Sequence, residues 1–157
     1  MAKLRRFAAL PMAEKSRTVE AAFYLLIVRI AFGLLPLPRA LRFFGIAQSE
    51  TGHGRIAAAE AELIGRAIGR AAGHVPFRAV CLQQAFAALL MLRRRGLAAT
   101  VHLGLIREDS ELKAHAWSHC GEVPVTGVAA ARGFAPIAAF AGRINPGCRA
   151  SAYSSGG

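Results

Sequence analysis

Acidic residues and cysteines are both scarce in this chain of 157 residues. Its nine acids comprise eight Glu and a single Asp, Asp109, which argues strongly against a metal or glycosidase site built from several aspartates. The three cysteines are too few for a disulfide-dense secreted scaffold, and no two of them have the spacing of a Cys-x-x-Cys motif. We therefore expect a reduced, cytoplasmic protein without a metal ion or a cofactor.

The chain also lacks a clean hydrophobic run of membrane-spanning length. Its most apolar stretch, residues 21–38, carries Arg29 in its middle and ends in two prolines. The first twenty residues lack the apolar core of a secretory signal. We expect a helix packed on the body or on a partner. Peripheral membrane contact stays open, because Arg29, Arg39 and Arg42 flank apolar faces.

Hydrophobic residues and arginine are abundant. The chain is 54% hydrophobic, which excludes a mostly disordered protein, and its formal net charge is +11. A net positive charge of this size favours binding to nucleic acid or to an anionic membrane surface. However, the arginines are scattered along apolar helices without interleaved aromatic residues, so we expect no nucleic-acid partner.

The periodicity of apolar residues changes along the chain and predicts an α+β fold. Helical spacing predicts helices over residues 13–35, 39–45, 55–72 and 81–95, and alternation predicts strands over 97–106, 113–119 and 123–125. We divide the chain into a helical arm, residues 1–46, a domain, residues 47–135, and a poorly structured tail, residues 136–157.

Cys81 begins the helix predicted with least ambiguity, directly after a proline-containing loop. Free N–H groups and the positive end of the helix dipole stabilise a thiolate there. His115 follows on a predicted strand, on one face with Trp117 and His119. A helix Cys followed by a strand His is the order found in papain-like and transglutaminase-like cores, although each residue alone is more often structural.

The sequence around these residues resembles a known family. The motifs are Cys81-Leu82-Gln83-Gln84-Ala85, Leu89-Leu90-Met91-Leu92-Arg93-Arg94-Arg95-Gly96-Leu97, Val101-His102-Leu103-Gly104-Leu105 and Ala114-His115-Ala116-Trp117. Together they resemble the leader peptidase of lasso-peptide biosynthesis, a transglutaminase-like cysteine protease encoded as the second half of a split B protein. The resemblance is strong over residues 75–126 and looser over the arm.

The resemblance implies a nucleophile helix packed on a small antiparallel sheet, with Cys81 as nucleophile and His115 as base. It implies removal of the leader from a ribosomally made precursor, after which a separate ATP-using cyclase closes a macrolactam. A leader-recognition domain is not evident in residues 1–46, so the resemblance implies that it is supplied by another polypeptide. We rank His102 and His119 below His115 mainly on this resemblance.

One departure concerns the third catalytic residue. The family places an Asp about a dozen residues after the His, whereas this chain has no Asp beyond Asp109. The orienting role falls to Glu122, Thr126 or Asn145, or is absent. Further candidates are Gln83 or Gln84 for the oxyanion, with the Cys81 N–H, and Trp117 as a wall of the site. We expect Cys120 and Cys148 to be structural or incidental.

Three other functions remain open at this point. The missing Asp is compatible with a catalytically impaired scaffold that docks the precursor and the cyclase. The same Cys–His chemistry would serve an acyltransferase that accepts an amine in place of water. The third is a basic module that binds a membrane or nucleic acid.

Overall fold

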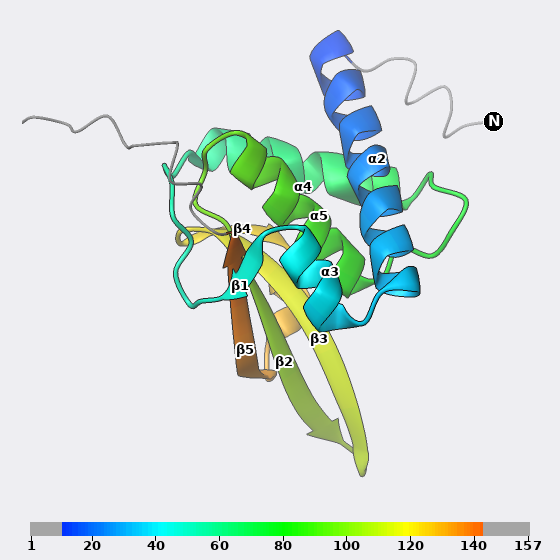
Figure 1. Ribbon diagram of the computed structural model, residues 1–157, viewed down its shortest axis with the longest axis vertical. Helices are drawn as coiled ribbons and strands as arrows, with labels where there is room; N and C mark the ends of the chain where they lie inside the picture. Colours follow the sequence, from blue (N-terminus) through cyan, green and yellow to red (C-terminus); the bar gives the residue numbers. More distant parts are fainter. Residues whose placement is uncertain (1–10, 143–157) are drawn as a thin grey trace, which may run out of the picture.

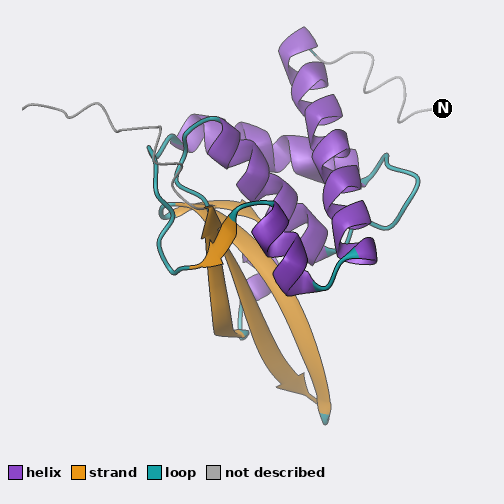
Figure 2. Cartoon of the chain, in the orientation of Figure 1, coloured by secondary structure: helices purple, strands orange, loops and turns teal. Residues whose placement is uncertain are grey.

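A computed structural model describes residues 11–142 as one helical layer packed against one antiparallel sheet (Figures 1 and 2). The helices are α2 (Met12–Leu34), α3 (Leu37–Phe43), α4 (Ala58–Ala72) and α5 (Cys81–Arg94), with a 3₁₀ turn, η1 (Val128–Ala131). The strands are β1 (Ile46–Gln48), β2 (Thr100–Glu108), β3 (Glu111–Cys120), β4 (Val123–Thr126) and β5 (Ala135–Gly142), in the spatial order β1-β5-β2-β3-β4. The predicted α+β class is confirmed.

Most of the predicted helices form within three residues of their expected bounds. The face of α2 turned to the core carries Thr18, Ala21, Leu25, Val28 and Ala31 at three- and four-residue spacing. Helix α3 begins at Leu37, two residues earlier than predicted. Pro36 caps this helix and Pro38 lies in its first turn, where a missing N–H removes no helical hydrogen bond.

The β2–β3 hairpin closes through a two-residue turn at Asp109 and Ser110. Both residues have positive φ, 46° and 71°, as a hairpin turn matched to the twist of the strands requires. The turn pairs Glu108 with Glu111, and pairing then continues to Thr100 and His119. The predicted change from helix to hairpin is confirmed.

The predicted tail begins too early, because residues 135–142 form β5 between β1 and β2. Alanine has a low strand propensity, so this Ala-rich strand has little sequence signal. Its one large inward side chain, Phe140, contacts Phe86 of α5 with ring centroids 6.0 Å apart. The expected boundary between residues 46 and 47 falls inside β1.

Helix α2 shares its hydrophobic core with α4 and α5. Leu25 and Val28 of α2 are fully buried in the same cluster as Phe86 and Leu89 of α5. Figure 1 shows α2 along the outer side of the helical layer. Among residues 11–142, none of the helices combines the length and apolar content that a bilayer crossing requires.

Candidate active site

Cys81 is the first residue of α5, as the sequence predicts. Two glutamines of the same helix fix the entering chain: the Val80 N–H donates to Gln83 Oε1 at 3.3 Å, and Gln84 Nε2 donates to the Ala79 carbonyl at 2.8 Å. The Cys81 side chain is half-buried and its thiol is free. The start of α5 therefore presents a sulfur atom at the positive end of a helix dipole.

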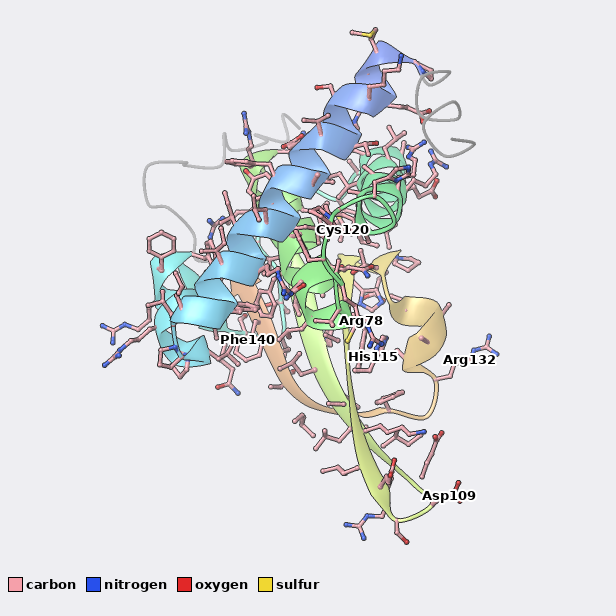
Figure 3. All side chains as sticks on the ribbon, turned by 90° about the vertical axis from the view of Figure 1, so that its right-hand side faces the viewer. Arg78, Asp109, His115, Cys120, Arg132 and Phe140 are labelled. Carbon is pink, nitrogen blue, oxygen red and sulfur yellow. The ribbon has the colours of Figure 1, made fainter. Side chains whose placement is uncertain are left out.

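His115 lies on β3, on the side turned toward η1 (Figure 3). Its Nε2 lies 2.8 Å from the Gly127 carbonyl oxygen. A carbonyl oxygen only accepts, so Nε2 carries the proton and Nδ1 of the neutral ring keeps a free lone pair. The ring also lies 6.1 Å from the Trp117 ring in a stacked arrangement and 5.3 Å from the Phe134 ring.

Gly127 has no room for a side chain. Its φ is +71°, and a Cβ there would lie 2.7 Å from the Ala116 carbonyl oxygen and 3.1 Å from His115 Nε2. The residue stands twelve positions after His115, where the family resemblance leads us to expect an acid. The side-chain pattern does not predict this contact, because the acceptor is a main-chain oxygen. The glycine at the position where the family has its acid is the one sequence feature that points to it.

Residues 24–139 match the family described as the transglutaminase-like superfamily. The chain belongs to the transglutaminase-like superfamily. Neither curated proteins nor solved structures gave a match. Members of this superfamily are commonly cysteine peptidases or transferases, and the fold class expected from the sequence agrees with the match.

In this transglutaminase-like chain, the candidate orienting residues lie elsewhere. Thr126 pairs with Ser118, hydroxyl to hydroxyl at 2.7 Å, inside the core. Glu122 occupies the turn between β3 and β4, where its charge acts on His119. Asn145 lies outside the described residues, as does Cys148. Within residues 11–142, neither Glu122 nor Thr126 bonds to His115.

His102 and His119, the other two candidate bases, form a row of rings with Trp117 on the same face of the transglutaminase-like sheet. His102 stacks on Trp117 at 5.7 Å and meets His119 edge-on at 5.4 Å. Burial lowers the pKa of His102, which Glu50 partly opposes. Burial and the neighbouring His102 lower the pKa of His119, which Glu122 partly opposes. Trp117 is 8% exposed and separates these two histidines from His115.

Alternation along β3 sends its neighbouring residues to opposite faces. Ala116, Ser118 and Cys120 are buried on the face that packs on the helices, and the Cys120 sulfur lies 4.0 Å from the Arg55 carbonyl oxygen. His115 belongs to the other face. In the described part of the chain, no hydrogen bond joins the Cys81 sulfur to His115, although both candidate residues have the secondary structure that the sequence predicts.

The described residues hold no cluster of three or more His, Cys, Asp or Glu side chains suited to a metal ion. A thiol at a helix start and an imidazole of fixed tautomer support nucleophilic acyl transfer.

Proposed function

We propose that this protein is a cysteine peptidase that removes the leader from a ribosomally synthesised lasso-peptide precursor. The observation that carries the proposal is Cys81 at the first position of α5 in a transglutaminase-like chain whose His115 has its Nε2 fixed by Gly127. The finer assignment rests on the motifs from Cys81 to Trp117 that resemble the lasso leader peptidase.

The proposed reaction begins with proton transfer from the Cys81 thiol to His115 Nδ1. The thiolate attacks the scissile carbonyl, and the negative oxygen is stabilised by the Cys81 backbone N–H. Collapse breaks the C–N bond: the leaving amine of the core peptide takes the proton from His115, and the leader stays on sulfur as a thioester. Water then attacks the thioester with His115 as base, which frees the leader carboxylate and restores the thiol.

Gly127 supplies the orienting contact in this mechanism. Its carbonyl holds the proton on Nε2, so Nδ1 is the nitrogen left for the thiol proton. A carbonyl lacks the full charge of a carboxylate and stabilises the imidazolium less. The contact fixes the tautomer and the ring orientation, which is the main role of the third member in such sites.

The freed core amine is the group that a separate macrolactam-forming cyclase would consume. The proposal therefore places this protein in the cytoplasm with three partners: the precursor, a leader-recognition protein and the cyclase. Within residues 11–142 Cys81 and His115 share no hydrogen bond, so the proposal requires the two side chains to come together when the precursor binds.

The test mixes purified full-length protein with a candidate precursor and its recognition protein and follows the precursor mass. Loss of the leader mass by wild type, and by Cys120→Ala, but not by Cys81→Ala or His115→Ala, would support the peptidase. Cys120→Ala is the matched control, since Cys120 lies on β3 and its free thiol is buried. Equal cleavage by wild type and Cys81→Ala would contradict the assignment.

A docking scaffold is the second candidate. Two observations within residues 11–142 favour it: His115 has no carboxylate partner, and it has no hydrogen bond to Cys81. Precursor and cyclase that both bind the protein, with an intact precursor after incubation, would select the scaffold. A leader mass increased by an added amine would instead identify an acyltransferase.

A further inference from the structure

The outward face of α2 is apolar along most of its length. Val19, Phe23, Leu26, Ile30 and Leu34 recur every three or four residues and define a stripe, which we call the α2 stripe. Their side chains are between 44% and 78% exposed. Phe43 of the adjoining α3 is 73% exposed as well. Within the described residues, nothing covers this surface.

The two acidic residues of α2 face the body instead. Glu14 pairs with Arg70 of α4 at 2.5 Å, and Glu20 pairs with Arg95, the C-cap residue of α5, at 2.6 Å. A surface helix usually turns its charges to water and its apolar side chains to the core. Helix α2 buries one apolar face, satisfies its acids inside the protein and leaves a second apolar face exposed. A contiguous exposed apolar surface of this kind marks an interaction site.

The surroundings of the α2 stripe are cationic. No acidic residue occurs from residue 21 to residue 49, whereas Arg29, Arg39 and Arg42 lie in this segment and are exposed. Arg29 extends over the Phe77 ring, 4.9 Å from its centroid, so it stays at the edge of the stripe. An apolar helix face bordered by arginines matches a lipid surface with negative headgroups, because long basic side chains reach the phosphates while apolar ones enter the acyl boundary.

We propose that the α2 stripe, with Phe43 and the three arginines, binds an anionic membrane surface with α2 in the plane of the interface. A second copy of the chain fits this surface less well, since each copy carries a net charge of +11 and would bring the same arginines together. The anionic surface neutralises these arginines and removes the stripe from water. This inference is independent of catalysis, so its test needs no precursor.

The test floats the full-length protein with phosphatidylcholine vesicles and with vesicles that also contain phosphatidylglycerol. We expect binding to the anionic vesicles that weakens with salt, and much weaker binding to phosphatidylcholine alone. Phe23→Glu and Ile30→Glu should each lower the partition coefficient by about tenfold or more, because a charge replaces an inserted apolar side chain. Arg39→Glu should lower the preference for anionic lipid by about tenfold or more.

Leu112→Glu is the matched control, since Leu112 is 63% exposed on the distant β2–β3 hairpin. It should bind like wild type. Unchanged binding of Phe23→Glu, equal loss with Leu112→Glu, or no flotation of wild type would each overturn the proposal. A wild-type dimer in light scattering that Phe23→Glu converts to a monomer would assign the stripe to a second copy and would also overturn it. The exposed variants should keep the wild-type near-ultraviolet circular dichroism.

Discussion

The Nε2 of His115 donates to the carbonyl oxygen of Gly127 across 2.8 Å, in a place where a side-chain acid has no room. The acceptor therefore cannot be removed by truncating a side chain. It can be displaced by adding one, because Gly127 has φ of +71°.

Gly127→Asp, which supplies the missing acid, should lower activity instead of restoring it. The new Cβ would lie 2.7 Å from the Ala116 carbonyl and force the main chain to shift, so the His115 contact would be lost. We expect kcat/KM for leader release to fall by at least about tenfold for both Gly127→Asp and Gly127→Ala. Faster cleavage by Gly127→Asp would show that a carboxylate, not the carbonyl, is the better partner in this fold.

The tautomer of His115 is directly measurable. Because Nε2 donates to a carbonyl, the neutral ring should be protonated at Nε2 and bare at Nδ1. Nitrogen-15 chemical shifts of the labelled protein at about pH 7.5 check this, with His115→Gln identifying the signal. A ring protonated at Nδ1, or one that exchanges freely between both tautomers, would contradict the assigned contact.

Acid should destabilise the fold through His102 and His119. Burial lowers the pKa of both below 6.5, so the folded state binds fewer protons than the unfolded state as the pH falls through 6.5. These two groups therefore leave the free energy of unfolding unchanged well above pH 6.5 and lower it as the pH falls through 6.5 toward their folded pKa values. Urea unfolding at about pH 7.5 and about pH 5.5 measures the slope, and His119→Gln should make it shallower.

Arg95 should contribute more to stability than its neighbour Arg94. Its guanidinium bonds to Glu20 of α2, to Glu60 of α4 and to the Met91 carbonyl of its own helix. Those contacts raise the pKa of Arg95, chiefly through Glu20. Arg95→Met should lower the free energy of unfolding by about 2 kcal/mol, since two glutamates lose a charged partner. Arg94 is exposed, so the free energy of unfolding of Arg94→Met should lie within about 0.5 kcal/mol of the wild-type value. Urea unfolding of the two variants measures the difference.

The sequence predicts the parts of this fold that rest on periodicity. Helix α5 begins at Cys81 as expected, and β2 and β3 form over the segments where alternation predicts strands. Strand β5 was missed because an Ala-rich segment carries no alternation, and its burial depends on strands far away in the chain. Strand β5 forms because it pairs with β1 and β2, and such long-range pairing cannot be read from the local sequence.

The candidate site divides in the same way. Cys81 and His115 could be placed on a helix start and on a strand, because those positions follow from local pattern. The partner of His115 could not, since a search among side chains overlooks a main-chain oxygen. The contact of Gln83 at the start of α5 uses its amide oxygen, so its role toward the oxyanion, which needs the amide N–H, stays a prediction.

A main-chain carbonyl gains no proton at the acidities at which a carboxylate becomes neutral. The partner of His115 is therefore chemically the same on both sides of that range. The acid side of the pH–rate profile would therefore lack the step that a titrating carboxylate adds. Leader release would decline in mild acid only as the other ionisable groups of the protein change charge.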